Sequence, residues 1–328
     1  MRTRTITQWV ASGAFAAAMF ASIGAQAQDY PVRPIQVIVP FAGGSASDVV
    51  TRIMLDRMAK TLGQPFIVDN RPGAGGNTGT LAAVRTAPDG YTLVMSTVGP
   101  LAANRTLFKS LGYDPEKDFT PISLFAVLPN VIVINSKLPP KTLTEFVAYA
   151  KQHPKELNYG SVGVGSSQHL AGAYFDQIAG VELVHVPYRN IAQYGPDLMS
   201  GAVPLGFQWY PNVSGPLGAK GAKALAVAGA NRLDAVPEAP TTKEAGLPEY
   251  QVSGWFALLA PKGTPAAIVT KLNTEMKAAL SDADVRAKFQ IQGAEPIWLS
   301  PEQAKKFIAD EIVKYRDIII KAGIPPIE

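Results

Sequence analysis

Two short segments rich in glycine and serine have the composition of anion-binding turns. The first reads FAGGSASD from Phe41 to Asp48, between an apolar stretch at 35–40 and a helical pattern. The second reads SVGVGSSQH from Ser161 to His169. Adjacent glycines let the backbone approach a ligand closely, and a helix start presents unpaired amides with a partial positive charge. Together the segments predict a site that holds an anion, such as a carboxylate, between two halves of the chain.

In the first segment we expect the amides of 44–47 and the side chain of Ser45 to face the ligand. Ser47 or Asp48 also fits an ordinary helix cap. Two roles are open for Asp48: contact with the ligand, or support of the loop or of a bound water. The candidate ligand-binding residues here are Phe41, Gly43, Gly44, Ser45, Ala46, Ser47 and Asp48.

In the second segment Ser166 and Ser167 stand at a predicted helix start. Their hydroxyl groups can donate to a ligand, and we expect one of the two to cap the helix instead. For His169 a structural hydrogen bond is the favoured role. The candidate ligand-binding residues here are Ser161, Gly165, Ser166, Ser167 and His169.

Further candidates lie at the ends of predicted strands, where ligands of open α/β sheets bind. They are Thr97 and Gly99 in the first half and Tyr188, Asn190, Gln208 and Tyr210 in the second. Trp209 and Tyr210 are predicted to point to opposite faces of one strand, so only one reaches the cleft. If Tyr210 and Phe41 both do, they could hold a flat aromatic acid between them.

Strand and helix patterns alternate along the chain, which is typical of mainly parallel sheets flanked by helices. A β-rich run at 122–135, interrupted at Pro129, and another at 252–260 are predicted to cross between two domains. We therefore predict an α/β chain with a discontinuous first domain, 28–126 plus 251–328, and a second domain, 127–250. The two β connections form a hinge on which the domains can close.

Several helix starts carry capping signals. Thr142 with Glu145 is predicted to cap one helix, and Thr241 with Glu244 a short one that stops at Gly246. Thr264 and Ser300, each followed by proline, are predicted to cap two helices near the C-terminus.

The first 27 residues have the pattern of an export signal. Arg2 and Arg4 precede an apolar run at 9–21, and 25–27 read Ala-Gln-Ala, a cleavage pattern of small residues. We expect cleavage after Ala27 and a periplasmic location. The apolar run is too short to cross a bilayer and no longer one follows, so we expect no membrane insertion.

Composition excludes several classes of protein. The chain has no cysteine, which excludes thiol catalysis, cysteine-ligated zinc and lipid anchoring. Its 30 basic residues, two of them in the predicted signal, nearly balance 26 acidic ones, so no nucleic-acid surface is expected. Zinc-protease, nucleophile-elbow and nucleotide-loop motifs are missing, and we expect neither enzyme activity, nor a metal, nor a cofactor.

The sequence resembles the Bug-type, or TctC-like, periplasmic substrate-binding proteins of tripartite tricarboxylate transporters. The resemblance runs through nearly the whole mature chain. The matching segments are NRPGAGGNTG from Asn70, APDGYTL from Ala87, YDPEKDFTPI from Tyr113, NYGSVGVGSSQHLA from Asn158, VPYRN from Val186, DLMSGAV from Asp197, PEAPTTKEAGLP from Pro237 and WFALLAPKGTP from Trp255.

The resemblance implies a type II, Venus-flytrap fold that captures an organic carboxylate and passes it to a membrane permease. In that family the two turns corresponding to 41–48 and 161–169 grip the carboxylate, partly through main-chain amides and ordered waters. Two departures stand out. The glycine pair sits one place earlier than usual, with Ser45 in place of the second glycine, and Arg189 is followed by Asn190 where the family more often has glycine.

Two other functions remain open at this point. A periplasmic hydrolase using Ser166 or Ser167 with His169 is disfavoured, because residues two or three apart at a helix start are poorly placed as nucleophile and base. A sensor that presents its closed form to a signalling partner uses the same closure as a transport receptor. The ligand is expected to be a dicarboxylate, a tricarboxylate or an aromatic acid, and the protein a monomer.

Overall fold

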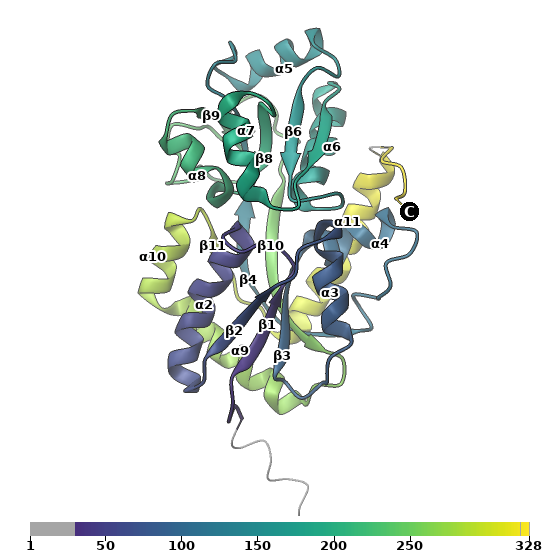
Figure 1. Ribbon diagram of the computed structural model, residues 1–328, viewed down its shortest axis with the longest axis vertical. Coiled ribbons are helices and arrows are strands. Elements are labelled where there is room, and N and C mark those ends of the chain that lie inside the picture. Colours follow the sequence, from purple (N-terminus) through teal and green to yellow (C-terminus); the bar gives the residue numbers. More distant parts are fainter. Residues whose placement is uncertain (1–29, 322, 328) are drawn as a thin grey trace, which may run out of the picture.

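The computed structural model describes residues 30–321 and 323–327, so the predicted signal at 1–27 lies outside the described residues. Two β-sheets lie one above the other along the long axis of the molecule (Figure 1). We call the part around the first sheet, 30–130 with 253–321 and 323–327, the first lobe. The part around the second sheet, 131–252, is the second lobe.

The first sheet has three parallel strands at one side and antiparallel pairings at the other. In spatial order its strands are β11 (Glu295–Pro296), β4 (Phe119–Pro129), β10 (Ser253–Pro261), β3 (Thr92–Thr97), β1 (Ile35–Val39) and β2 (Phe66–Asn70). The β1 strand is buried along nearly its whole length, as expected for a strand covered by helices on both faces.

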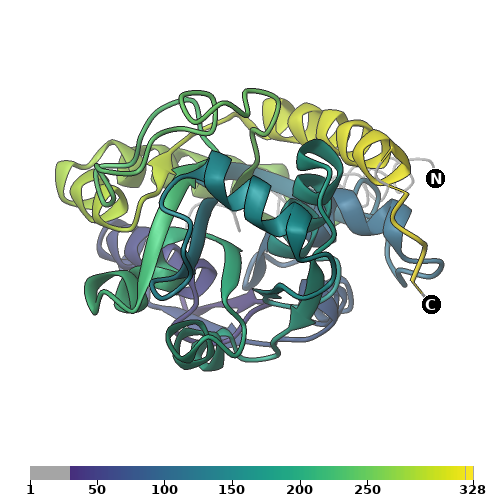
Figure 2. The same ribbon diagram turned by 90° about the horizontal axis from the view of Figure 1, so that it is seen from above.

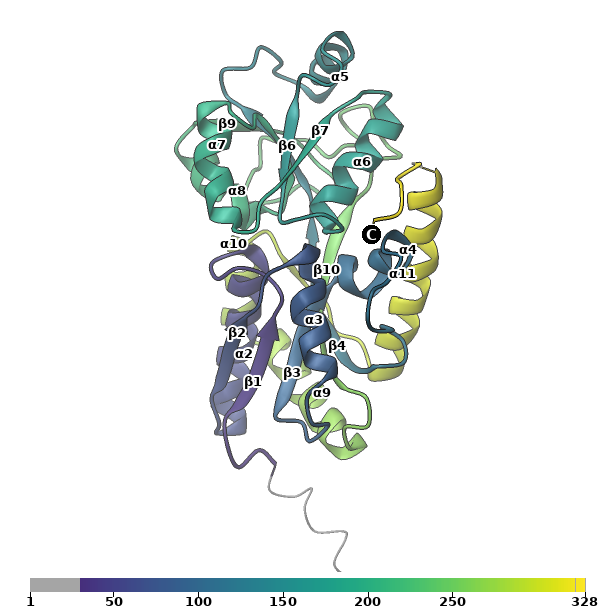
Figure 3. The same ribbon diagram turned by 45° about the vertical axis from the view of Figure 1, so that its right-hand side comes forward.

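Helices cover both faces of this sheet (Figures 1 and 3). One face packs against α2 (Ala46–Leu62), α9 (Ala266–Ser281) and α10 (Ala283–Ile291). The other packs against α3 (Asn77–Val84), η2 (Gly99–Ala103), α4 (Asn104–Leu107) and α11 (Pro301–Lys321). A short 3-10 turn, η1 (Ala74–Gly76), precedes α3. Ile308, Tyr315 and Ile319 of α11 are buried in the core on this second face.

The second sheet is built in the same way. In spatial order its strands are β7 (Val184–Pro187), β6 (Asn158–Ser161), β8 (Leu205–Gln208), β5 (Val131–Asn135) and β9 (Ala222–Val227). The β6 strand is parallel to both neighbours and β5 antiparallel to both of its own. The surrounding helices are α5 (Leu143–Gln152), α6 (Ser167–Ala179), η3 (Ile191–Gln193), α7 (Tyr194–Ser200) and α8 (Tyr210–Gly218). The view from above shows α5 on the outer end of this lobe (Figure 2). The predicted α/β class with two sheets is confirmed.

The chain crosses between the sheets twice, and the crossings touch. The first passes from β4 to β5 through Asn130, and the second enters β10 after Val252. The backbone and side-chain nitrogens of Asn130 donate to the Val252 carbonyl at 3.0 and 3.2 Å. The Ala228 amide donates to the Asn130 carbonyl at 2.8 Å. The predicted interruption of the β-rich run therefore lies one residue after Pro129.

Two of the predicted helix starts are wrong. At 241–246 the chain forms a turn, although Thr241 and Glu244 make the reciprocal bonds of a capping box at 2.8 and 3.2 Å. Gly246, in a left-handed conformation, ends this turn before a helix can continue. Thr264 does not cap α9, because its hydroxyl donates to the Pro261 carbonyl. The other two caps are confirmed: Thr142 Oγ1 accepts from the Glu145 amide and Ser300 Oγ from the Gln303 amide, both at 3.2 Å.

The expectation that Tyr210 continues a strand is also wrong. The β8 strand ends at Gln208, and Tyr210 is the first residue of α8. Pro211 explains the change, because its fixed φ and missing amide hydrogen suit the first turn of a helix. Within the described residues, no helix has the length and apolar character needed to cross a membrane.

Candidate functional site

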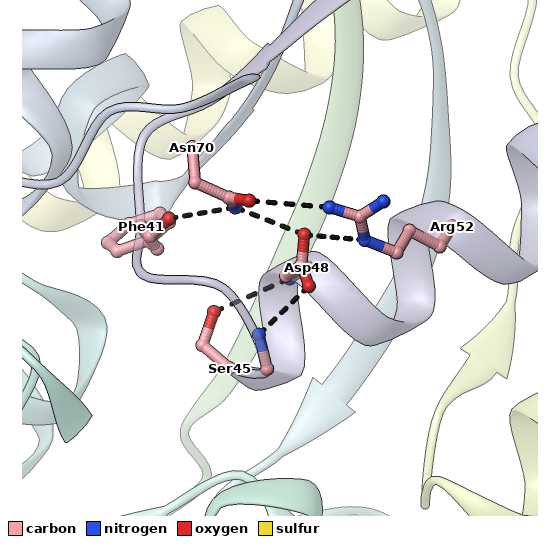
Figure 4. A network of polar contacts seen from close by, with 6 residues as sticks. Phe41, Ser45, Asp48, Arg52 and Asn70 are labelled. Carbon is pink, nitrogen blue, oxygen red and sulfur yellow. Dashed lines mark hydrogen bonds and ion pairs between the residues drawn. The ribbon is translucent and has the colours of Figure 1, made fainter. Parts of the chain in front are cut away.

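A polar network fixes the first turn, with Asp48 at its centre (Figure 4). One carboxylate oxygen of Asp48 accepts from the Gly44 amide at 2.9 Å. The other accepts from Arg52 Nε at 2.9 Å and from Asn70 Nδ2 at 3.0 Å. Asn70 Nδ2 also donates to the Phe41 carbonyl at 3.0 Å. Of the two roles open for Asp48, this arrangement favours support of the loop.

The cap of α2 is Ser45, so the expectation that Ser47 or Asp48 caps the helix is wrong. Ser45 has the extended backbone of an N-cap, and its Oγ accepts from the Asp48 amide at 3.4 Å. The predicted amide donors are partly occupied. Gly44 donates to Asp48, and Ala46 donates to Asn212 Oδ1 of the second lobe at 3.0 Å. Gly43 lies against Asn70, and Ser47 is buried in the first turn of α2.

The second turn is arranged in the same way at the start of α6. Ser166 is the N-cap, and its Oγ accepts from the His169 amide at 3.3 Å. The Gly165 amide donates to His169 Nδ1 at 3.2 Å, which gives His169 the structural bond that was expected. The hydroxyl of Ser167 and both polar atoms of the Gln168 side chain are buried without a hydrogen-bond partner in the described part of the chain. The sequence reasoning missed Gln168.

Two partly buried, uncharged histidines, His169 and His185, lie against this turn and help to hold it in place. Ser161 Oγ lies 2.6 Å from His185 Nε2, and the rings of His185 and His169 are 4.1 Å apart. Burial lowers the pKa of His169 to about 4. Burial, together with the neighbouring His169, lowers the pKa of His185 to about 3. Ser161 is fully buried and also bonds to Gly163, so the pair holds the turn and is no exposed nucleophile and base.

The two lobes meet at glycines. A Cβ atom added to Gly75 would lie 2.2 Å from the Val164 carbonyl oxygen, and one on Gly99 would lie 2.4 Å from the Gly165 carbonyl oxygen. Contacts this short leave no space for a side chain. Gly99 follows Thr97, which is buried at the end of β3. The backbone of the first lobe therefore lies directly against the second Gly-Ser turn.

A small cavity is enclosed where the lobes meet. It has a volume of about 10 Å³, roughly the space of one water molecule. The first lobe lines it with Phe41, Ala42, Ser45, Pro72 and Gly73, and the second lobe with Val162, Arg189 and Ile191. A more open cavity of about 380 Å³ lies beside it, between 73–75 and the segments 162–164 and 187–189. The lobes are thus closed around the first turn.

The candidates at the second-lobe strand ends serve mainly as supports. Tyr188 donates from its hydroxyl to Asp197 at 2.6 Å, and Asn190 Oδ1 accepts from the Ala192 amide at 3.1 Å. Gln208 donates to the Gly160 carbonyl at 2.7 Å and accepts from Asn212 Nδ2 at 3.1 Å.

Asn212 therefore connects Gln208 to the Ala46 amide across the lobe boundary. The sequence reasoning missed it, although a polar residue directly after Pro211 at a helix start is a signal that could have found it.

Phe41 lines the small cavity at the lobe boundary, whereas Tyr210 lines neither of the two cavities there. The Phe41 ring packs near Gly76, where an added Cβ would lie 2.9 Å from it. Tyr210 packs near Gly293, where an added Cβ would lie 3.1 Å from the Cβ atom of Tyr210. The sandwich was conditional on both rings reaching the cleft, and Tyr210 belongs to a helix and not to the strand that was predicted to aim it.

The chain is similar to known receptors over almost its whole length. The sequence model of the tripartite tricarboxylate transporter family receptor matches residues 50–324. Protein BugT of Bordetella pertussis is 36% identical over 312 residues, which are 95% of this chain and 96% of BugT.

Solved structures show the same similarity over almost the whole chain. An R. palustris protein solved with adipate is 36% identical with a TM-score of 0.87, covering 91% of this chain and 100% of the other. The periplasmic binding protein BugD is 31% identical with a TM-score of 0.86, covering 91% and 100%. MatC from Rhodopseudomonas palustris, with bound malate, is 36% identical with a TM-score of 0.81, covering 88% and 100%. The chain therefore belongs to the tripartite tricarboxylate transporter receptor family.

Proposed function

We propose that this protein is a periplasmic receptor that binds a small organic carboxylate between its two lobes and delivers it to the membrane subunits of a tripartite transporter. The observation that carries the proposal is that two Gly-Ser turns at helix starts, one from each lobe, border the same lobe boundary. The α2 and α6 helices both begin at such a turn, Ser45 of the first turn and Val162 of the second line one small cavity, and Gly75 and Gly99 of the first lobe lie against the second turn. Helix starts attract anions through their unpaired amides and their dipole.

Buried polar atoms without partners support a polar ligand in this region. The Ser167 hydroxyl and the Gln168 carboxamide belong to the first turn of α6, and the Thr51 hydroxyl belongs to the second turn of α2. A buried polar group that lacks a hydrogen bond destabilises the protein, so such groups mark places where a bound molecule supplies the missing bonds.

The ligands of the relatives narrow the class. Adipate and malate are aliphatic dicarboxylates, and the proteins solved with them are each 36% identical to this chain. An aromatic acid has less support, because Phe41 and Tyr210 do not face one another across one cavity.

Ligand entry into the small cavity at the first turn requires the lobes to separate, because that cavity holds about one water. We propose that the domains are 28–126 with 251–328, and 127–250. The adjacent crossings at Asn130 and Val252 would act as their hinge.

Binding is tested on protein purified from a periplasmic extract. Thermal unfolding is followed with a panel of dicarboxylates, tricarboxylates, aromatic acids and amino acids. A ligand that binds only the folded protein adds about 2.7 kcal/mol of stability at a hundredfold excess over Kd, so the melting temperature should rise. If no acid in the panel raises it, the carboxylate assignment is wrong. N-terminal sequencing of the same sample tests cleavage after Ala27.

Delivery needs a separate test. Cells that lack the receptor should lose saturable uptake of the radiolabelled ligand identified by the panel, and regain it when the gene is restored. Unchanged uptake would favour the sensing role instead.

A further inference from the structure

One arginine occupies a special position at the lobe boundary. Arg189 lines both cavities there: the small one beside Phe41 and Ser45, and the open one beside 73–75. Every other residue that lines either cavity is uncharged. Among the described residues, exposed Arg189 therefore contributes the single formal charge to the lining of these two cavities.

This charge has no partner. In the described part of the chain, Arg189 takes part in no ion pair and no hydrogen bond. Arg52, close to the first turn, is by contrast paired with Asp48. That pair also neutralises the one carboxylate in the first turn, so no acid of the turn competes for Arg189.

The backbone on both sides of Arg189 is held in place. The Tyr188 amide donates to the Ser161 carbonyl at 2.9 Å, and its hydroxyl donates to Asp197. On the other side, Asn190 caps η3 through the Ala192 amide. An arginine presented from such a fixed turn loses less freedom on binding than one on a mobile loop.

We infer that Arg189 pairs with the second carboxylate of the ligand and makes the receptor prefer dianionic over monoanionic acids. This inference rests on the proposed function, in which the first carboxylate lies at the helix starts. Guanidinium and carboxylate form charge-assisted, often bidentate hydrogen bonds, which are stronger in a cleft that closes and excludes water. Because Arg189 belongs to the second lobe and Ser45 to the first, a ligand bound to both would also hold the lobes together.

The test compares pairs of acids with equal carbon chains. Adipate with hexanoate and succinate with butyrate are titrated calorimetrically against the wild type and Arg189→Gln. In the wild type, the dicarboxylate of at least one pair should bind roughly tenfold or more tightly than its monocarboxylate. In Arg189→Gln that dicarboxylate should lose most of this advantage, while monocarboxylate affinity stays within about threefold. Raising the salt concentration should weaken dicarboxylate binding in the wild type more than in the variant.

Arg85→Gln is the matched control. Arg85 is also an exposed arginine that forms no ion pair with any residue the structure describes, and it lines neither cavity. Its replacement should leave all affinities unchanged. Equal weakening of both acids in Arg189→Gln, or no weakening of either, would overturn the role of Arg189 while the receptor function stands. A wild type that binds none of these four acids, while another acid of the melting panel does bind, would overturn the role of Arg189 and leave the receptor function standing. No response to any acid of the panel would overturn both.

Discussion

At the scale of single residues, most polar side chains near the lobe boundary hold the backbone in place. The side chains of Asp48, Gln208 and Tyr188 each form hydrogen bonds with other groups of the protein. The sequence predicted polar side chains here from their place at strand and helix ends. The sequence could not show which of these side chains have hydrogen-bond partners, because the partners lie in other elements. Gln208 bonds to Asn212, and Tyr188 bonds to Asp197.

Asp176 should make stability depend on pH. Burial raises its pKa from 3.8 to about 7, and Glu182 adds to the effect. The folded protein then holds a proton that the unfolded chain releases. The contribution to stability is therefore fully present below about pH 4 and is lost as the pH rises through 7.

We predict that Asp176→Asn stabilises the protein at pH 8, on the order of 1 to 2 kcal/mol after allowance for partial exposure. The gain should shrink at pH 4. The amide oxygen of Asn can still accept from Leu183, so the bond at 3.2 Å is kept. Chemical denaturation at pH 4, 6 and 8 measures the change, and a gain independent of pH would contradict the argument.

The buried histidines act in the opposite direction. The pKa values of His169 and His185 are lowered from 6.5 in the folded protein. Their contribution to the free energy of unfolding is therefore present above pH 6.5 and is lost as the pH falls toward the lowered pKa values. We predict that the His185→Gln variant loses less free energy of unfolding than the wild type when the pH falls from 6.5 to 4, as measured in the same denaturation series. An unchanged slope over this range would count against a buried neutral His185.

At the scale of elements, the starts of α2 and α6 follow one plan: a glycine in a left-handed conformation, then a serine cap. The sequence predicted both helices and a cap at either Ser166 or Ser167. It misplaced the cap of α2 by two or three residues, since the choice depends on where the backbone leaves the extended conformation. Ser45, Ser47 and Asp48 are all residue types that cap helices, so the local sequence does not indicate at which of them the extended segment ends.

Ser166 and Ser167 provide a matched pair for the α6 start. We predict that Ser166→Ala lowers the free energy of unfolding by about 1 kcal/mol, because the His169 amide loses its acceptor. Ser167→Ala should change stability little, because its hydroxyl bonds to nothing in the described residues.

Ligand binding should respond to Ser167 more than to the cap. If its hydroxyl meets the ligand, Ser167→Ala weakens binding by a factor of about two to ten, the worth of one ordinary hydrogen bond. Calorimetric titration beside thermal unfolding separates the two effects. A large loss of unliganded stability in Ser167→Ala would show that its role is structural.

At the scale of the whole molecule, closure depends on backbone contacts between the lobes. Gly99 touches the Gly165 carbonyl across the boundary, so a methyl group at 99 would oppose closure and leave the open form free of strain. We predict that Gly99→Ala weakens ligand binding by a factor of roughly five to a hundred, since overpacking costs about 1 to 3 kcal/mol. Calorimetry measures the affinity, and small-angle X-ray scattering follows compaction on adding ligand.

Gly215→Ala is the control for this change. An added Cβ there meets nothing within 4 Å, so affinity and compaction should stay as in the wild type. Normal affinity and full compaction in Gly99→Ala would mean that the liganded form does not bring these two backbones together.

The sequence by itself determined most of the elements, the two Gly-Ser turns and the two crossings, because hydrophobic period, glycine placement and proline act within a few residues of chain. Only the tertiary structure decided which groups face the lobe boundary. Arg189 enters it between Tyr188 and Asn190, and Asn212 reaches Ala46 from 166 residues away. Such pairings follow from how helices and strands pack, and packing joins residues that carry no sequence signal of one another.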